Sequence, residues 1–312
     1  MTLWEILRAQ RFVCSDDLFA RLAAEKLNGG RMPRNTIAIQ HGAGTFKATA
    51  EGKNVVWQYG TQEIHGSTCN FTVTDDNAQI LVSFDGLLTK FVSNSDAQIL
   101  LDLSDLGGKV TYYLNLYNCK NITGNLSDLG GKVTYYLNLF NCNNTTGSLS
   151  DLDGKLTNYL NLYNCANITG SLSDLDGKLT NYLNLYNCTN ITGSLADLGG
   201  KLTTSLNLSD CPNITGSLSD LGGKLTNYLN LSGCQNITGV YSGNSYPTSV
   251  NLSNTGLTAA DMDQTLINFN AGTTKSGTFT ANGMTRTAAS DDAVAGLTEK
   301  GWKFTGLTKI EG

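Results

Sequence analysis

Hydrophobic and polar positions recur every 23 residues through the middle of the chain. Each copy places a leucine pair, L-x-L, ahead of a cysteine and a following N-I-T-G or similar turn. A fixed period of about 20 to 30 residues is typical of a solenoid, in which each turn buries its apolar edge against its neighbours. The first leucine recurs at Leu114, Leu137, Leu160, Leu183, Leu206 and Leu229, and the cysteine at Cys119, Cys142, Cys165, Cys188, Cys211 and Cys234.

The residues on either side of the leucines are expected to face solvent on the concave side of the solenoid. Alternate residues of a strand point to opposite faces, so burial of Leu160 and Leu162 directs their neighbours outward. Stacked copies then give two aromatic rows flanking an asparagine row, which suits a glycan or an extended peptide because rings pack on apolar faces and amides bind hydroxyls. The predicted ligand-binding residues are Tyr113, Asn115, Tyr117, Tyr136, Asn138, Phe140, Tyr159, Asn161, Tyr163, Tyr182, Asn184 and Tyr186.

These rows also have a purely structural interpretation. Identical side chains stacked across a sheet stabilise it by themselves. The near-identity of the copies favours this interpretation, because a site for one small ligand would differ from copy to copy. Ligand binding and scaffolding therefore both stay open.

Three further repeated positions carry structural predictions. Side chains of the cysteines point the same way in stacked copies and do not converge as a disulfide requires, so they are expected to be buried free thiols. The asparagine two residues after each cysteine, such as Asn167, is expected to turn inward and satisfy backbone groups of the loop. The aspartate row that includes Asp174 and the lysine row that includes Lys178 are expected to form alternating charges.

Two further units are predicted ahead of the repeats. Residues 1–30 fit two short helices that are too apolar for a free hairpin, so we expect them to bind another chain, with packing on the next domain as the alternative. Residues 31–86 alternate in short strands separated by turn residues, which predicts a small antiparallel β-sandwich. The predicted assembly residues of the helical segment are Trp4, Leu7, Phe12 and Phe19.

The solenoid itself is predicted to cover residues 87–257. Residues 87–109 form a degenerate copy, in which Phe91 takes the place of the first leucine and Asp96 the place of the cysteine. Such a copy is expected at the end of a solenoid, where the core needs a cover. Six regular repeats follow in residues 110–245.

An α/β cap is predicted to close the chain in residues 258–312. The pattern indicates helices at Ala259–Phe269 and Ser290–Lys300 with a strand at Gly277–Ala281 between them, and the W-K-F-T run from Trp302 is expected to close the chain as a strand. Trp302 is expected to cover the last core layer. The predicted fold class is therefore an α/β repeat solenoid with a small β-sandwich and a short helical segment at its amino-terminal end.

Composition narrows the possible functions. A net charge of -5 with only 15% charged residues argues against nucleic acid, which requires a clustered basic face. No apolar run approaches the length needed for membrane insertion. His41 and His65 are expected to be ordinary core or surface histidines, and no triad, metal cluster or phosphate loop is present in the sequence. We therefore expect neither a cofactor, nor a metal, nor enzymatic activity.

The repeated L-x-L-x-x-C-x-N-I pattern resembles the leucine-rich repeat family, although Leu156 stands four rather than three residues before the L-x-L pair. The N-I-T-G-S-L run is similar to the L-T-G-x-I-P stretch of plant-type repeats. Trp57, followed shortly by Gly60, is weakly similar to a PKD-like domain. The G-T-F-T-A-N-G run near the carboxyl end resembles the closing cap of leucine-rich proteins from gut bacteria and their phages.

These resemblances imply a protein that works outside the cell, whereas the amino terminus lacks the pattern of a secretory signal. The combination predicts a phage virion appendage, a head or tail fibre component that adheres to a host glycan or protein. The amino-terminal helices would then contact other virion proteins, and a homo-oligomer is expected. The alternatives are a bacterial cell-surface adhesin and a purely structural decoration or spacer protein.

Overall fold

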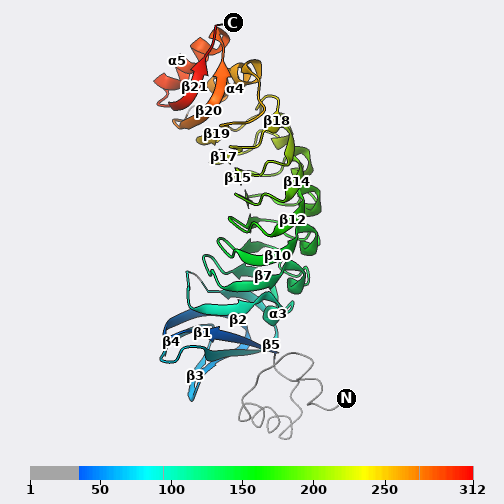
Figure 1. Cartoon of the computed structure of the whole chain (residues 1–312), viewed down its shortest axis with the longest axis vertical. Coiled ribbons are helices and arrows are strands. Elements are labelled where there is room, and N and C mark those ends of the chain that lie inside the picture. The colour runs from blue at the N-terminus through cyan, green and yellow to red at the C-terminus, as the bar shows by residue number, and fades with distance from the viewer. Residues whose placement is uncertain (1–34, 94, 274, 312) are drawn as a thin grey trace. The chain divides into compact units, whose positions relative to one another are not determined.

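The computed structural model describes residues 35–93, 95–273 and 275–311. The predicted helical segment of residues 1–30 lies outside these ranges, together with its four predicted assembly residues. Within the described ranges the predicted solenoid is confirmed, because short strands and single-turn helices recur with the 23-residue period. Figure 1 shows strands such as β15 and β17 stacked on one side of the repeats, and strands such as β12 and β14 on the other side with the single-turn helices.

One copy consists of two short strands and one turn of 3-10 helix. In the copy after Leu156 these are β11 (Tyr159–Asn161), β12 (Ile168–Ser171) and η3 (Leu172–Leu175). Asn164 lies three residues beyond the first strand, in the left-handed conformation with φ 61°. Gly170 has φ 110°, and a Cβ there would lie 2.8 Å from the backbone of the preceding copy. Glycine is therefore required where consecutive copies approach most closely.

The first strands of all copies pair in one parallel sheet without a shift in register. Leu160 of β11 lies opposite Leu137 on one side and Leu183 on the other. The strands of this ladder are β7 (Val110–Asn115), β9 (Tyr136–Asn138), β11, β13 (Tyr182–Asn184), β15 (Ser205–Asn207), β17 (Tyr228–Asn230) and β19 (Ser249–Asn251). The second strands form parallel pairs of their own: β6 (Ile99–Asp102), β8 (Ile122–Asn125), β10 (Asn144–Ser148), β12, β14 (Ile191–Ser194), β16 (Ile214–Ser217) and β18 (Asn236–Thr238).

Each single-turn helix is held by a capping box. The backbone N–H of Ser171 donates to the Asp174 carboxylate over 2.8 Å, and the Ser171 hydroxyl accepts from the N–H of Ser173 over 3.2 Å. The aspartate row therefore has a capping role that the predicted alternation of the Asp174 and Lys178 rows did not include, because the aspartate lies three residues into the turn and reaches the first amide. Lys178 instead pairs with the exposed Asp176 at 2.6 Å. The turns are α3 (Leu103–Leu106), η1 (Leu126–Leu129), η2 (Leu149–Leu152), η3, η4 (Leu195–Leu198) and η5 (Leu218–Leu221).

The cysteines form a row of buried free thiols, as predicted. Cys165 is 0% exposed, and its Sγ donates to the carbonyl oxygen of Leu139 in the preceding copy over 3.1 Å. The other five cysteines of the row make the equivalent contact at 3.0 to 3.2 Å. Burial raises the pKa of the Cys165 thiol to about 12. The thiol thus packs as a small apolar group and also links neighbouring copies.

Antiparallel strands precede the repeats. Their core contains Trp57, Phe46 and Phe71, each no more than 1% exposed. Strand β2 pairs with β3, β4 and β5, so the antiparallel pairing expected for this region is present, while the sandwich form stays a prediction. The strands are β1 (Asn35–His41), β2 (Gly44–Tyr59), β3 (Gln62–His65), β4 (Thr68–Val73) and β5 (Ala78–Val92).

Strand β5 belongs to both the antiparallel strands and the repeat sheet. One edge pairs with β2, and the other pairs in parallel with β7, where Phe91 lies opposite Leu114. Phe91 thus occupies the position of the first leucine, as the degenerate copy predicts. The division expected between residues 86 and 87 falls inside this continuous strand. In Figure 1 the strand runs directly below β7.

The cysteine position of the degenerate copy has a separate role. Asp96 lies there, and its carboxylate is 3.1 Å from Nε2 of His41, which is 0% exposed. Strand β1 pairs antiparallel with β6 at His41 and Ile99, which brings the two side chains together. His41 is therefore a core histidine with a carboxylate partner, whereas His65 is exposed.

The carboxyl-terminal segment continues the same parallel sheet with longer connections. Val250 pairs with Phe279 of β20, and Phe279 with Phe304 of β21. Trp302 is 2% exposed, and its ring packs edge-on against Phe269 at 5.6 Å, as expected for a residue that covers the last layer. The elements confirm the predicted helix–strand–helix–strand order: α4 (Ala259–Gly272), β20 (Thr278–Arg286), η6 (Ala288–Ser290), α5 (Asp291–Glu299) and β21 (Lys303–Lys309).

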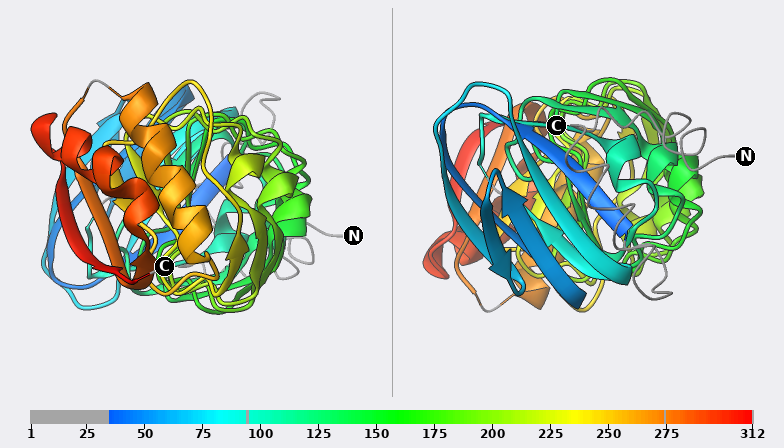
Figure 2. Two further views of the ribbon diagram at one scale, coloured as in Figure 1. Left: turned by 90° about the horizontal axis from the view of Figure 1, so that it is seen from above. Right: turned by 90° about the horizontal axis from the view of Figure 1, so that it is seen from below.

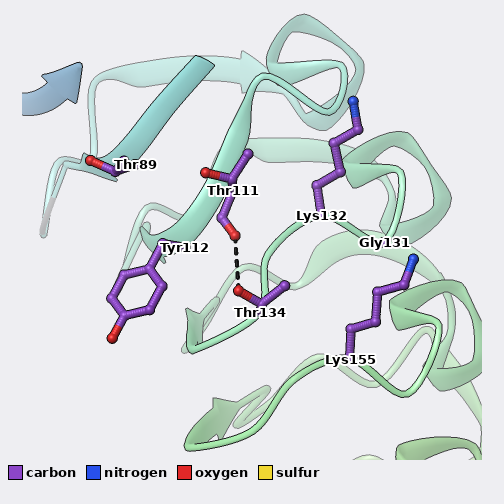
Figure 3. A pocket seen from close by; sticks show the side chains of 7 residues that line it. All are labelled: Thr89, Thr111, Tyr112, Gly131, Lys132, Thr134 and Lys155. Atoms are coloured by element: carbon purple, nitrogen blue, oxygen red, sulfur yellow. Dashed lines mark hydrogen bonds between the residues drawn. The ribbon is translucent and has the colours of Figure 1, made fainter. Parts of the chain in front are cut away.

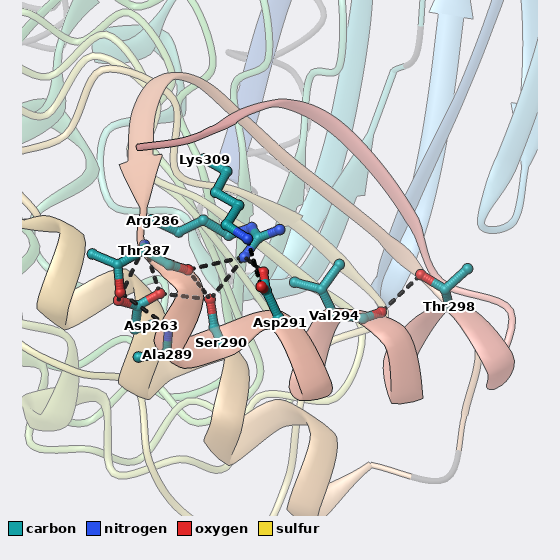
Figure 4. A network of polar contacts seen from close by, with 9 residues as sticks. All are labelled: Asp263, Arg286, Thr287, Ala289, Ser290, Asp291, Val294, Thr298 and Lys309. Carbon is teal, nitrogen blue, oxygen red and sulfur yellow. Dashed lines mark hydrogen bonds and ion pairs between the residues drawn. The ribbon is translucent and has the colours of Figure 1, made fainter. Parts of the chain in front are cut away.

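Helices α4 and α5 lie side by side over the end of the sheet (Figure 2). Among the residues described, no helix has the length and apolarity needed to cross a bilayer. A polar network joins α4 to the turn before α5 (Figure 4). Asp263 is 5% exposed and accepts hydrogen bonds from the Ser290 hydroxyl at 2.5 Å and the Thr287 hydroxyl at 2.6 Å. Arg286 pairs with Asp291 at 2.6 Å beside it.

We expect the buried thiols to resist labelling in the folded protein. A Cys14→Ser variant removes the cysteine outside the described residues, and its seven remaining cysteines are all buried. Because burial raises the pKa of thiols such as Cys165 and excludes reagent, a soluble thiol reagent at pH 8 should label none of them within minutes. Labelling of all seven should follow unfolding in guanidinium. Rapid labelling of a repeat cysteine without denaturant would contradict the stacked arrangement.

We expect Asp263→Asn to destabilise the protein by about 2 kcal/mol at pH 7, since its hydroxyl donors lose a charged acceptor. Burial alone would raise the pKa of Asp263, but the hydrogen bonds from Ser290 and Thr287 and the charge of Arg286 hold that pKa below its usual range. The carboxylate therefore stabilises the fold above a pH of about 4, and this stabilisation is lost as the pH falls through the folded-state pKa.

Denaturant unfolding between pH 7 and pH 2 measures this difference. The difference in the free energy of unfolding between the parent protein and Asp263→Asn should become smaller as the pH falls. The exposed first-turn variant Asp292→Asn is the control and should change stability little at any pH. If Asp263→Asn lost the same stability at every pH, the charge of the Asp263 carboxylate would not contribute to the stability of the fold.

Candidate binding face

Two rows of aromatic rings run along the solvent side of the parallel sheet, as the sequence predicts. The first row stacks with ring centroids 4.0, 4.1 and 4.3 Å apart, and the second with centroids 4.4 to 4.6 Å apart. The ring planes within a row are inclined by no more than 22°. Tyr113, Tyr136, Tyr159 and Tyr182 form the first row, and Tyr117, Phe140, Tyr163 and Tyr186 form the second.

Face-to-face stacking changes what these rings offer to a ligand. Inside a row, both faces of a ring such as Tyr159 are covered by its neighbours, so its edge and its hydroxyl remain for contact with a ligand. Burial raises the pKa of Tyr136 to about 12, and burial together with the adjacent phenols also raises the pKa of Tyr159. These two phenols are therefore neutral hydrogen-bonding groups near pH 7. At the amino-terminal end of the first row, Lys90 lies 5.4 Å from the Tyr113 ring centroid.

The predicted asparagine row is mostly buried, contrary to the expectation of exposed amides. Asn138, Asn161 and Asn184 are 4%, 4% and 6% exposed. Oδ1 of Asn161 accepts from the backbone N–H of Tyr163 at 3.1 Å, and its Nδ2 donates to the Tyr159 hydroxyl at 3.4 Å. The first strand has only three residues, so the side chain folds back to satisfy the amide just beyond it.

Asn115 differs from these three residues because it is only partly buried. Its Oδ1 accepts from the N–H of Tyr117 at 3.0 Å. In all four copies of the predicted site, the asparagine side chain therefore accepts a hydrogen bond from the backbone just beyond the strand. It does not present a continuous line of free amides to solvent.

A short third aromatic row was not predicted as part of the site. Tyr112 and Tyr135 are 47% and 36% exposed and stack at 4.6 Å. They stand where later copies have Asn158 and Asn181, so the substitution was visible in the sequence. Tyr112 lines an open hollow of about 590 Å³ whose other walls include Lys132. Figure 3 shows Lys132 and Lys155 extending from one side of the hollow and Tyr112 lying on the other.

A second asparagine ladder at the strand ends was also missed. Nδ2 of Asn141 donates to Oδ1 of Asn118 at 3.1 Å, Asn164 donates to Asn141 at 3.0 Å, and Asn187 donates to Asn164 at 3.2 Å. All four residues have φ between 57° and 61°. Asparagine tolerates this left-handed conformation better than most residues. The signal was present in the sequence, because an asparagine directly precedes the cysteine in these copies.

The asparagines that follow each cysteine make the backbone contacts expected of them. Nδ2 of Asn167 donates to the carbonyl oxygen of Asn143 in the preceding copy at 3.0 Å. The equivalent bonds in the other copies measure 2.8 to 3.2 Å. These side chains are exposed rather than turned into the core, so they join neighbouring loops from outside.

In the part of the chain that the structure describes, no group of three or more His, Cys, Asp or Glu side chains is arranged so that it could hold a metal ion. Comparison of the chain with protein-family models, with curated proteins and with solved structures finds no match. The likeness of the repeats to leucine-rich repeats therefore rests on their period, their strands and their buried cysteines.

We expect the strand-end asparagine ladder to stabilise the stack through both its amide bonds and its backbone conformation. Asn164→Ala should destabilise the protein by about 2 to 3 kcal/mol, since it loses two ladder bonds and places alanine at positive φ. Asn164→Gly, which tolerates this φ, should lose about 1 kcal/mol less. Thermal and denaturant unfolding of both variants measure the two parts separately. Equal stability of the two variants would show that the left-handed backbone contributes nothing.

Proposed function

We propose that this protein is a non-enzymatic attachment protein that binds an extended ligand, a glycan or a peptide, along the aromatic rows of its repeat sheet. One observation carries the proposal. Partly exposed aromatic rings continue without interruption from Tyr113 to Tyr186 along the solvent side of the sheet. A ligand that runs along the repeats would meet the same chemical groups at each step.

The mode of contact follows from the stacking. Ring edges and phenol hydroxyls face the ligand, while the faces inside each row are already in contact with one another. Tyr112, Tyr117 and Tyr135 are the most exposed of the aromatic side chains, at 47%, 38% and 36%. We therefore place the strongest ligand contacts at the amino-terminal repeats, in residues 112–140. Tyrosine supplies contact area with little loss of conformational entropy, which suits this role.

A structural spacer is the second candidate, and the ladders favour it. Each copy contacts the preceding copy through several side chains. In one copy these are the thiol of Cys165, the amide of Asn164 and the ring of Tyr159. Thr157 adds another link, since its hydroxyl donates to the Thr134 carbonyl oxygen at 3.0 Å. These contacts stabilise a stack of copies whether or not its surface binds anything.

The finer parts of the proposal come from sequence resemblance. The repeated L-x-L strand and buried cysteine support our proposal that the repeats are leucine-rich repeats, and the strands before them are proposed to be PKD-like. The proposed setting is the surface of a phage particle, with residues 1–30 binding other virion proteins and the repeats adhering to the host. A bacterial cell surface is the alternative setting, and a homo-oligomer stays a prediction.

The proposal is tested by the binding of the full chain to cells of candidate gut bacteria and to polysaccharide isolated from them. A triple variant with Tyr112→Ser, Tyr117→Ser and Tyr135→Ser removes the most exposed rings of the face. We expect it to bind at least about tenfold more weakly, a loss of about 1.4 kcal/mol.

A matched control carries Ser150→Ala, Ser173→Ala and Ser219→Ala in the exposed single-turn helices, away from the sheet. It should bind like the parent protein. Unfolding curves verify that both variants are folded. Binding by the folded tyrosine variant that equals the parent would remove the sheet face from the mechanism, and no binding by any form would favour the spacer.

A further inference from the structure

The first aromatic row is interrupted in the same copy in which the second row ends. Ser205 takes the place of the first-row tyrosine, and Ser209 the place of the second-row ring. The parallel register puts Ser205 opposite Tyr182 in the strand before it and opposite Tyr228 in the strand after it. One ring is therefore missing between two rings of the same row.

The spacing of the strands predicts room for one ring between Tyr182 and Tyr228. Neighbouring strands are about 4.7 to 4.9 Å apart, so two steps from Tyr182 to Tyr228 span about 9.5 Å. Carbon atoms in contact are about 3.5 to 4.0 Å apart, which leaves room for a single ring between the two phenols. In the uninterrupted part of the row, each strand step holds one ring, with centroids 4.0 to 4.3 Å apart. Ser205 lies at the base of this position and is 7% exposed.

A buried amide beside the missing ring has an unused donor. In the adjoining copies, Nδ2 of Asn184 donates to the Tyr182 hydroxyl at 3.1 Å, and Nδ2 of Asn230 donates to the Tyr228 hydroxyl at 3.0 Å. Asn207 is the equivalent residue and is only 8% exposed. Ser205 supplies no phenol. Within the described residues no hydrogen bond leaves Nδ2 of Asn207, and this atom is not among the fully buried atoms that lack a partner, so solvent reaches it.

The orientation of this amide is fixed from its other end. Oδ1 of Asn207 accepts from the backbone N–H of Ser209 at 3.1 Å and from its hydroxyl at 2.7 Å. The equivalent Oδ1 bond is present in the copies that retain tyrosine. Nδ2 of Asn207 is therefore directed as in those copies, toward the position that a tyrosine hydroxyl would occupy.

Ser249, farther along the same row, does not lie between two tyrosines. Ser249 also replaces a tyrosine, but the strand beyond it places Thr278 opposite. A ring bound there would have Tyr228 on one side only. In the described repeats, Ser205 is the serine of the first row that has a tyrosine on both sides.

We propose that the space over Ser205 is a binding site for one pyranose ring of a glycan, which inserts between Tyr182 and Tyr228 and accepts a hydrogen bond from Nδ2 of Asn207. The C–H faces of the sugar pack on the two phenol faces that the row leaves uncovered. A pyranose fits better than a phenol because its rim carries several hydroxyls, and Ser205 and the two tyrosine hydroxyls lie around it. The site rests on the proposed function only in taking the ligand to be a glycan.

The test uses the full chain and saturation-transfer NMR with methyl glycosides of glucose, galactose, mannose, rhamnose, N-acetylglucosamine and N-acetylgalactosamine. At least one glycoside should bind, with its ring protons closest to tyrosine protons. Ser205→Tyr restores the uninterrupted row and should reduce this binding at least about tenfold while leaving the thermal midpoint unchanged or higher. Ser205→Ala keeps the space open and should bind within about threefold of the parent protein.

Each result decides the question. Binding of none of the six glycosides, or undiminished binding by a folded Ser205→Tyr variant, overturns the site. Binding of p-cresol in place of every glycoside also overturns it and indicates a tyrosine side chain as the occupant. The cell-binding assay separates this inference from the proposed function. Adhesion without glycoside binding leaves the attachment function standing alone, and glycoside binding at Ser205 without adhesion leaves the site standing alone.

Discussion

In the first strands of successive 23-residue copies, each residue lies opposite its own equivalent, and the ladders of the repeats depend on this. In a parallel stack, each side chain meets its own equivalent about 4.7 to 4.9 Å away. The residue types that recur are therefore those that can satisfy themselves at this distance. Asn164 binds Asn141, Tyr159 stacks on Tyr136, and the Cys165 thiol reaches a carbonyl of the preceding copy. A slip of one residue would break all of these contacts together.

The parts of the fold that follow from local pattern could be predicted from the sequence. The period located the leucines, the buried cysteines and the strands, and the pattern after the repeats located α4 and α5. The role of β5 could not be predicted in the same way, because a change in composition near residue 86 says nothing about which strands pair across it. Phe91 was recognised as the equivalent of Leu114, yet its strand also pairs with β2 along its other edge.

The candidate site was predicted in position but not in chemistry. Alternation along a strand placed Tyr159 and Asn161 on the solvent side, and the rings do lie in rows there. Alternation does not predict that a side chain folds back to bind the backbone just beyond a three-residue strand. The burial of Asn161 was therefore missed. Nor does it specify ring rotamers, which decide whether neighbouring rings present faces or edges. The surface consequently offers edges and hydroxyls where faces and amides were expected.

The continuity of β5 has a mechanical consequence. In the proposed attachment role, force would pass between the antiparallel strands and the repeats. Here no flexible linker separates the antiparallel strands from the repeats, since one strand of 15 residues belongs to both. Tension between them would act across that strand, on the ladder hydrogen bonds of both its edges, so the two parts cannot separate without breaking a ladder. The junction is thereby suited to stay folded while the protein is pulled.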